Sequence, residues 1–209
     1  MMPHDKPSHD GLVPLREVMA RHGLVPDKRL GQNFLLDRNI TDKIVRGAGF
    51  VDADCAVLEI GPGPGGLTRS ILLAGADPLH VVEKDTRCIG ALEDLRRDFP
   101  DQTFVIHHGD ALQMAPDEIL QTHKGGKIKI IANLPYNVAS PILISWLKWI
   151  AAKRPPYITD MTLMFQREVA QRITAAPGQR SFGRLSVMAQ WLCECAPCFD
   201  IPASAFTPP

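Results

Sequence analysis

Ala56-Val57-Leu58-Glu59-Ile60-Gly61-Pro62-Gly63-Pro64-Gly65-Gly66 is the stretch that decides the fold. It is an apolar run that ends in a glycine-rich loop, and a helical pattern from Leu67 to Leu73 follows at once. Glycines let such a loop turn tightly and let a ligand approach the main chain, because no Cβ stands in the way. The stretch therefore predicts a strand, a ligand-binding loop and a helix in that order.

Short apolar runs and helical patterns alternate on both sides of this stretch. Nearly continuous apolar strands that alternate with helices predict an α/β fold with a mainly parallel central sheet. Asp37 is expected to cap the helix that runs to about Ala48. We expect the other helices at 15–22, 67–73, 87–97, 117–121, 140–150, 168–174 and 185–193, and strands at 56–60, 79–82, 103–107, 128–131, 161–165 and 197–201.

Length and composition indicate one catalytic domain. A chain of 209 residues can bury one full core, and we place that domain at residues 28–209, after a leader with a short helix at residues 1–27. The polar start has no secretory signal and no run approaches the ~20 apolar residues of a membrane span, so we expect a cytoplasmic monomer that does not interact with a membrane. The net charge is zero, which excludes a global cationic field.

The five cysteines favour reduced thiols over a disulfide framework, because the count is odd and the spacing irregular. The cluster Cys193, Cys195 and Cys198 is a possible metal site, but a closed zinc site needs four ligands and neither cysteine nor histidine follows it. We therefore expect no metal and interpret these residues as core thiols.

The glycine loop alone leaves two cofactors open. Gly61, Gly63 and Gly66 match the dinucleotide pattern G-x-G-x-x-G, and Glu83 follows Gly61 by 22 positions, near the ~20 expected for an acid that binds a ribose. NAD and S-adenosylmethionine both present an adenosine ribose to such an acid. The pattern therefore predicts an adenosine-containing cofactor without choosing between them.

Two acids favour the methyl donor. Glu59 precedes the turn, and an acidic loop suits the sulfonium cation; Asp110 follows the third strand, where its carboxylate can accept from the adenine amine of the cofactor. The alternative is that Asp110 only caps the next turn. Lys84 and Ala111, next to Glu83 and Asp110, complete the expected cofactor-binding set.

The segment Asn133-Leu134-Pro135-Tyr136 follows an apolar strand and favours S-adenosylmethionine over NAD as the cofactor. The adenine amine is a poor nucleophile because its lone pair is delocalised into the ring. The Asn133 side-chain carbonyl and the Leu134 main-chain carbonyl can each accept one N–H and leave the lone pair free. Pro135 stiffens the turn, and Tyr136 offers a face on which an extruded base can stack. An ordinary strand-to-helix turn is the alternative.

Together these motifs resemble the ribosomal RNA small subunit adenine N6,N6-dimethyltransferase family over about Lys28 to Pro209. The matching segments are LGQNFL at 30–35, EIGPGPGGLT at 59–68, VVEKD at 81–85, GDAL at 109–112, NLPYN at 133–137, FQREVAQRI at 165–173, FGRLS at 182–186 and FTPP at 206–209. The resemblance implies a Rossmann-like methyltransferase fold that uses S-adenosylmethionine.

The resemblance also implies residues that local patterns do not reveal. In the family, the cofactor is surrounded by residues that correspond here to Asn33, Leu35, Gly61, Glu83, Asp110 and Asn133. Tyr136 and Phe206 would flank the target adenine. Family members dimethylate two adjacent adenines in a hairpin near the 3′ end of small-subunit ribosomal RNA, within the pre-30S particle, and carry a helical C-terminal domain that this chain lacks.

A local surplus of cations is compatible with an RNA partner. Residues 122–184 hold ten basic residues against two acids, although solvated helix faces often show such runs. We expect Gln179 to Arg184 to be an RNA-contacting loop. The ten are Lys124, Lys127, Lys129, Lys148, Lys153, Arg154, Arg167, Arg172, Arg180 and Arg184.

Three other functions remain open. The macrolide-resistance family methylates large-subunit ribosomal RNA with the same segments, but it usually has Ile where this chain has Leu134. An NAD-dependent dehydrogenase would need a hydride-handling His or Tyr-Lys site, which we do not find. A non-catalytic RNA-binding assembly factor could keep the fold, but it would not need an intact Asn133 to Tyr136 segment.

Overall fold

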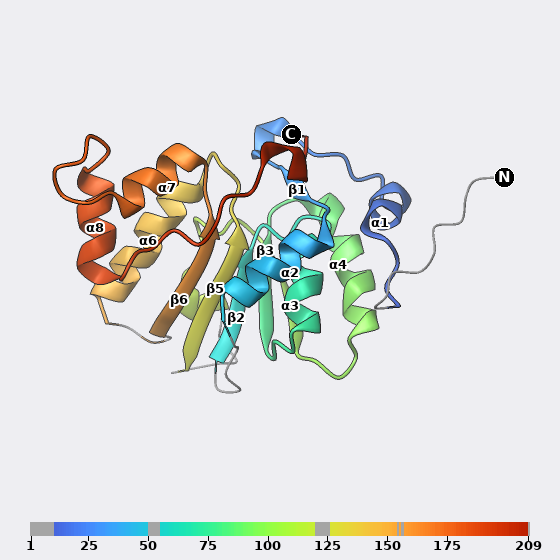
Figure 1. Ribbon diagram of the computed structural model, residues 1–209. Coiled ribbons are helices and arrows are strands. Elements are labelled where there is room, and N and C mark those ends of the chain that lie inside the picture. The colour runs from blue at the N-terminus through green and yellow to red at the C-terminus, as the bar shows by residue number, and fades with distance from the viewer. Residues whose placement is uncertain (1–10, 50–54, 120–125, 154, 156, 209) are drawn as a thin grey trace.

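The computed structural model describes residues 11–49, 55–119, 126–153, 155 and 157–208. A five-stranded sheet runs through its centre with helices on both faces (Figure 1). Its strand order is β4-β3-β2-β5-β6, and all four pairings are parallel. This confirms the predicted α/β class. The strands are β2 (Cys55–Ile60), β3 (Leu79–Glu83), β4 (Phe104–His108), β5 (Lys127–Asn133) and β6 (Tyr157–Met164).

The helices match the expected ones to within a few residues. Asp37 caps its helix as predicted, since its side chain accepts a hydrogen bond from Asn39 N at 2.9 Å. The helices are α1 (Leu15–Arg21), α2 (Arg38–Gly47), α3 (Gly66–Leu73), α4 (Thr86–Asp98), α5 (Pro116–Ile119), α6 (Ala139–Ala151), α7 (Arg167–Thr174) and α8 (Arg184–Leu192), with single 3₁₀ turns at η1 (Lys28–Leu30) and η2 (Ala203–Ala205). The expected continuation of α5 beyond Ile119 lies outside the described residues.

The two faces of the sheet bury alternate residues of each strand, as the two-residue period of a strand requires. Along β2, Val57 belongs to the core under α2, α3 and α4, whereas Ala56 and Leu58 belong to the core under α5 and α6. Both cores reach β5, where Ile131 faces the first and Ile130 the second. Burial on both faces explains why these strands read as continuous apolar runs.

The strand expected at 197–201 does not form, and that prediction is wrong. After α8 the chain crosses back toward the centre of the molecule (Figure 1). Phe199 and Ile201 pack against the core under α2 and α3, and the Lys43 ammonium lies 4.1 Å from the centre of the Phe199 ring. A short apolar run does not reveal its partner, and here helix α2 replaces a strand.

A second, two-stranded sheet joins segments far apart in the sequence. β1 (Phe34–Leu35) pairs with β7 (Phe206–Thr207) in antiparallel register, with Leu35 opposite Phe206. Two-residue strands carry no periodicity, so no pattern predicts them. The pairing brings the segment before α2 next to the end of the described chain.

The short helix α1 packs onto the domain. Its residues Val18 and Met19 join a cluster with Phe34 and Cys88, and the imidazole of His22 lies 2.7 Å from the Asp94 carboxylate on α4. Residues 1–10 lie outside the described residues. Among the described helices, none combines the length and apolar character that a membrane crossing requires.

Candidate functional site

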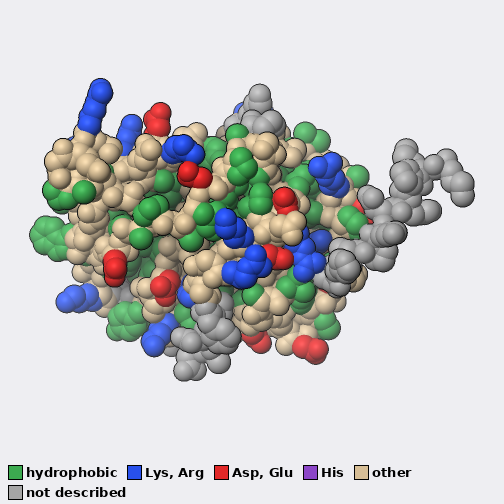
Figure 2. All heavy atoms as spheres, in the orientation of Figure 1, with side chains coloured by type: hydrophobic (Ala, Val, Ile, Leu, Met, Phe, Trp, Pro, Cys, Tyr) green, Lys and Arg blue, Asp and Glu red, His purple; other side chains and the backbone are tan. Residues whose placement is uncertain are grey.

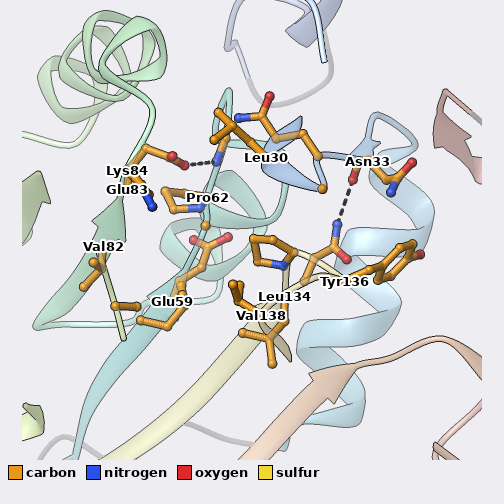
Figure 3. Close-up of a pocket in the computed structure, with 18 of the residues that line it drawn as sticks. Leu30, Asn33, Glu59, Pro62, Val82, Glu83, Lys84, Leu134, Tyr136 and Val138 are labelled. Carbon is orange, nitrogen blue, oxygen red and sulfur yellow. Dashed lines mark hydrogen bonds between the residues drawn. The ribbon is translucent and has the colours of Figure 1, made fainter. Parts of the chain in front are cut away.

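A cavity opens where the direction of the strand order reverses. From β2 the chain moves outward to β3 and β4, then returns to β5 on the other side of β2. The loops after β2 and β5 therefore leave in opposite directions, and open α/β sheets bind ligands at this point. The loops that follow β2, β3, β4 and β5 line the cavity, together with residues 29–35 (Figure 3).

The glycine loop is shaped by close neighbours as well as by backbone conformation. Gly61 and Gly63 have φ of +67° and +55°. A Cβ on Gly63 would lie 2.9 Å from the Phe34 ring, and one on Gly66 would lie 2.5 Å from the Leu35 carbonyl oxygen. The pattern that predicted a cofactor loop therefore also allows residues 34–35 to pack directly on it.

Glu83 holds the glycine loop in place. One oxygen of its buried carboxyl accepts from Gly63 N at 2.9 Å, and the other accepts from Asp85 N at 2.7 Å. Burial raises the pKa of Glu83, and these N–H donors partly offset the rise. Each oxygen retains a second lone pair, so the carboxylate can still accept from a ribose hydroxyl, the role predicted for it.

Glu59 is fully buried beside Glu83. Desolvation raises the pKa of Glu59 to about 8; the nearby Thr68 hydroxyl opposes the rise and Glu83 adds to it. Its Oε2 atom has no hydrogen-bond partner among the described residues. This carboxyl at the wall of the cavity is therefore neutral near pH 7, and a cationic ligand bound beside it would favour its ionised form.

Asp110 makes the turn cap that was one of its two predicted roles, and its position leaves the other role, cofactor binding, as a prediction. It lines the cavity, and its Oδ1 also accepts from Leu112 N at 3.0 Å, so it caps the turn after β4. Lys84 Nζ donates to its Oδ2 at 2.8 Å and lowers the pKa of Asp110. Figure 3 shows Lys84 next to Glu83 at the end of β3.

Asn133 lines the cavity and carries a buried acceptor atom that is unpaired within the described residues. Its Nδ2 donates to the Asn33 main-chain oxygen at 3.0 Å, which fixes the orientation of the amide because only the nitrogen can face a carbonyl. The buried Oδ1 atom has no hydrogen-bond partner among the described residues. Buried polar atoms are nearly always paired, so this oxygen indicates a donor that a ligand supplies.

The next three residues complete this corner. Leu134 is buried. The ring of Pro135 packs closely on the glycine loop, since a Cβ on Gly61 would lie 3.2 Å from it. The Pro135 carbonyl accepts from Val138 N at 3.1 Å and starts the turn into α6. Tyr136 is partly buried at the cavity wall, which raises the pKa of its hydroxyl. Figure 3 shows the Tyr136 ring beside Asn33.

The structure brings all but one of the predicted site residues to the same cavity. Phe206 is the exception: among the described residues, those that line the cavity do not include it, and its side chain packs partly against the core under α2 and α3. Strand pairing nevertheless places it opposite Leu35. The gathered residues are Asn33, Leu35, Gly61, Gly63, Glu83, Lys84, Asp110, Ala111, Asn133, Leu134, Pro135 and Tyr136.

Several lining residues were not predicted. Some are apolar and carry no chemical signal, so only the folded chain identifies them. Gln32 stood within a quoted motif, but the sequence does not tell which way its side chain points. The missed residues include Leu30, Gln32, Val82, Val138 and Ile142.

The cations of residues 122–184 do not form one face. Lys129 is buried and donates to the Ala48 carbonyl oxygen at 2.8 Å, so it is unsuited to RNA. Arg167 pairs with Asp200 at 2.9 Å. In Figure 2 the cationic side chains near α7 and α8 stand apart from one another. Lys124 and Arg154 lie outside the residues described in full.

The cysteine cluster is only partly a set of core thiols. Cys193 and Cys195 pack against the core between α6 and α8, whereas Cys198 is exposed, which corrects the prediction for that residue. The reason is that the chain after α8 is irregular and does not form the expected strand. Within the described ranges, no group of three His, Cys, Asp or Glu side chains is arranged to hold a metal.

Comparison with known proteins supports the methyltransferase interpretation. The sequence profile of the family Ribosomal RNA adenine dimethylase matches residues 26–209. A protein of Chelativorans sp. named Ribosomal RNA small subunit methyltransferase A is 50% identical over 97% of this chain and 71% of its own length. A protein of the same name from Mesorhizobium japonicum is 48% identical over 97% of this chain and 72% of its own length.

Solved structures agree with the sequence comparison. A dimethyladenosine transferase from Plasmodium falciparum superposes with a TM-score of 0.66 at 27% identity over 83% of this chain. The 23S rRNA methyltransferase ErmE superposes with a TM-score of 0.59 at 28% identity over 76% of this chain. The matched part spans 57% of each of these two solved chains.

These likenesses confirm the predicted fold class and the predicted class of enzyme, a methyltransferase, and leave no role for the dehydrogenase alternative. The glycine loop and the Asn133 to Tyr136 segment line the same cavity. With a profile match over most of its length and about half of its residues identical to those of bacterial relatives, the chain belongs to the ribosomal RNA adenine dimethylase family.

Proposed function

We propose that this enzyme transfers methyl groups from S-adenosylmethionine to N6 of two adjacent adenines in a hairpin near the 3′ end of small-subunit ribosomal RNA. The names of the relatives support the small subunit as the target. We further propose that it acts as a cytoplasmic monomer on the pre-30S particle during ribosome assembly.

One observation carries this proposal, the unpaired Oδ1 atom of Asn133. An adenine amine is a donor of two N–H groups, and a buried acceptor at the carboxyl end of β5 suits one of them. The Leu134 carbonyl is the second acceptor. With both N–H groups held, the nitrogen lone pair leaves conjugation with the ring and turns toward the methyl donor. Catalysis then rests on positioning, and the acidity of the methylated amine makes a strong base unnecessary.

Aromatic stacking fixes the target base. Tyr136 lies at the cavity wall and offers one ring face, which is worth ~1 to 3 kcal/mol per stacked base. Phe206 is the proposed second face. Because its side chain packs partly against the core, stacking on both sides requires Phe206 to turn when the base enters.

The residues around the glycine loop fit S-adenosylmethionine. Glu83 suits the ribose hydroxyls, and Asp110, held by Lys84 at 2.8 Å, suits the adenine amine. The buried carboxyl of Glu59, neutral near pH 7 in the free protein, would ionise beside the positive charge of the ligand, and its Oε2 atom is unpaired within the described residues. The bound cofactor supplies an electrophilic methyl group on a sulfonium, and the protein residues orient it and exclude water.

RNA contacts are proposed for the loop at residues 179–184. Gln179, Arg180 and Arg184 are exposed there, and the loop connects α7 to α8 outside the core. Phosphate contacts by exposed arginines position an RNA without reading its sequence. Selection of the two adenines therefore depends on the cavity and on the shape of the particle.

The test is to incubate the protein with isotope-labelled S-adenosylmethionine and small ribosomal subunits that lack the modification, and to map methyl groups by mass spectrometry. We expect dimethyladenosine at two adjacent positions near the 3′ end. Label on guanine would refute the proposal. Label on large-subunit RNA would instead support the macrolide-resistance alternative, and binding of RNA without any methyl transfer would support a non-catalytic assembly factor.

A further inference from the structure

Residues 27–35 form a segment, here called the strap, of which residues 29–35 line one wall of the cavity. The strap touches the loops after β2 and β5: Phe34 packs on Gly63, and Gly31 lies where a Cβ would be 2.6 Å from Asn137 Oδ1. Its end is held by the β1–β7 pairing, whereas residues 31–33 belong to no helix or strand and depend more on side-chain contacts.

Gln32 makes the polar connection between the strap and the sheet. Its Oε1 accepts from Asp27 N at 2.9 Å, which closes the strap on itself, and its Nε2 donates to Asp85 Oδ2 at 2.9 Å. The two partners are a donor and an acceptor, so they determine which end of the amide faces each. Gln32 therefore links the strap to Asp85, two positions after Glu83 at the end of β3.

Asp85 is a rigid anchor for this contact. Its buried carboxylate receives Arg87 Nε at 2.9 Å and Nη2 at 2.6 Å, and it caps helix α4. Its backbone N–H also donates to Glu83, the acid that holds the glycine loop. A donor to a carboxylate makes a stronger hydrogen bond than one to a neutral acceptor, so the Gln32 contact is well suited to fix a loop.

Asn33 follows Gln32 directly and faces the opposite wall. Its main-chain oxygen receives Asn133 Nδ2 at 3.0 Å and so determines how the Asn133 amide, and with it Oδ1, is turned. If the strap moves, the Asn133 amide loses the contact that orients it. The hydrogen bonds of Gln32 thus act indirectly, through Asn33, on the orientation of the Asn133 amide.

We infer that Gln32 is a positioning residue: it latches the strap onto Asp85 and thereby keeps the Asn33 carbonyl where it orients Asn133 for methyl transfer. The effect on transfer rests on the proposed function, whereas the latch itself can be tested without RNA. Opening of the strap would also release the cofactor, because the strap forms one wall of its cavity.

The first test compares Gln32→Met, which keeps the length of the side chain but removes both hydrogen bonds, with Gln171→Met at an exposed position on α7 as control. We expect Gln32→Met to speed amide hydrogen exchange in residues 27–35 and cofactor dissociation by about tenfold, the loss of one bond to a charged group. The single-turnover methyl-transfer rate at saturating cofactor should fall by a similar factor. A purely structural role would leave that rate unchanged.

The second test reverses the donor and the acceptor. Gln32→Glu places two carboxylates together and should be at least as damaging as Gln32→Met. Adding Asp85→Asn lets the new amide donate to the new carboxylate, but the same NH2 group then faces the Arg87 Nη2 donor, so slow exchange and slow cofactor release should return only in part. Unchanged exchange and release in Gln32→Met would overturn the latch. Loss of methyl transfer in every protein, the unsubstituted one included, with the exchange effects intact would instead refute the proposed function.

Discussion

Gly63 in the cavity loop and Gly178 between α7 and α8 share a left-handed backbone, with φ of +55° and +90°, but their surroundings differ. A Cβ on Gly63 would lie 2.9 Å from the Phe34 ring, whereas one on Gly178 would have nothing within 4 Å. At the first position the backbone and its neighbours both require glycine; at the second only the backbone does.

The same contrast holds for the two regions as a whole. All six residues of β2 are buried, whereas α7 has no buried residue and Trp191 on α8 is 83% exposed. Around the cavity several polar side chains also hold another part of the site, as Glu83 holds Gly63. Substitutions there should change packing and chemistry together, whereas substitutions of exposed residues on α7 and α8 should change only the surface.

The largest expected effect is that of Asn133→Ala. Removing the Oδ1 acceptor should lower the methyl-transfer rate by about 10²- to 10³-fold, the usual loss when one preorganised polar group is removed from a site. Cofactor affinity should fall far less, which titration calorimetry can measure next to single-turnover rates. Asn39→Ala, on the exposed side of α2, is the control. Equal losses of rate and affinity would show that Asn133 only holds the cofactor.

Gly63→Ala and Gly178→Ala test the comparison directly. Both variants place a Cβ on a left-handed residue, at a cost of about 1 to 2 kcal/mol in the free energy of unfolding. Gly63→Ala also collides with Phe34 and should lose a further ~1 to 3 kcal/mol, together with cofactor binding. Urea denaturation and calorimetry provide the measurements. Equal losses for the two variants would contradict the difference between the regions.

Glu59→Gln should change how stability depends on pH. The folded-state pKa of Glu59 is raised from 4.5 to about 8, so the folded protein binds this proton more tightly than the unfolded chain does. Stability from this group is therefore full below pH ~4.5 and declines as pH rises toward 8. At pH 9 the neutral Gln variant should be more stable than the unsubstituted protein by about 1 kcal/mol or more. Parallel stability curves from pH 5 to pH 9 would argue against a buried neutral acid.

The smallest effect is expected for Arg180→Ala in the exposed loop between α7 and α8. Loss of one phosphate contact should weaken binding to small subunits a few-fold and lower the slope of log affinity against log salt by about 0.7 to 0.9. Stability and cofactor affinity should not change, because the side chain is exposed. Filter binding at several salt concentrations measures the slope, and an unchanged slope would remove this loop from the RNA interface.

Much of the site follows from local sequence signals, for reasons that can be stated residue by residue. The spacing of the loop glycines and of an acid after the next strand identifies Gly61, Gly63 and Glu83, because sheet geometry brings consecutive strand ends together. The Asn133 to Tyr136 segment was found for the same reason. Asn33 and Leu35 were implied only by resemblance, since they reach the cavity from a segment without periodicity.

Several features depended on contacts that no local pattern contains. The apolar residues Phe199 and Ile201 predicted a strand but pack beside α2 instead, and the partial packing of Phe206 against the core was not predicted. Lys129 was counted among the basic residues compatible with an RNA partner, yet its ammonium reaches the Ala48 carbonyl oxygen. In each case the residue type was read correctly, but the sequence did not reveal the contact.

The sequence by itself determined the parallel α/β sheet, the cofactor loop and the Asn-Leu-Pro-Tyr segment, because each depends on residues within a few positions of one another. Only the tertiary structure decided that the strap forms one wall of the cavity, that Gln32 reaches Asp85 and that the Asn33 carbonyl orients the Asn133 amide. Those contacts join residues 53 and 100 positions apart, and their geometry exists only once the strands have assembled.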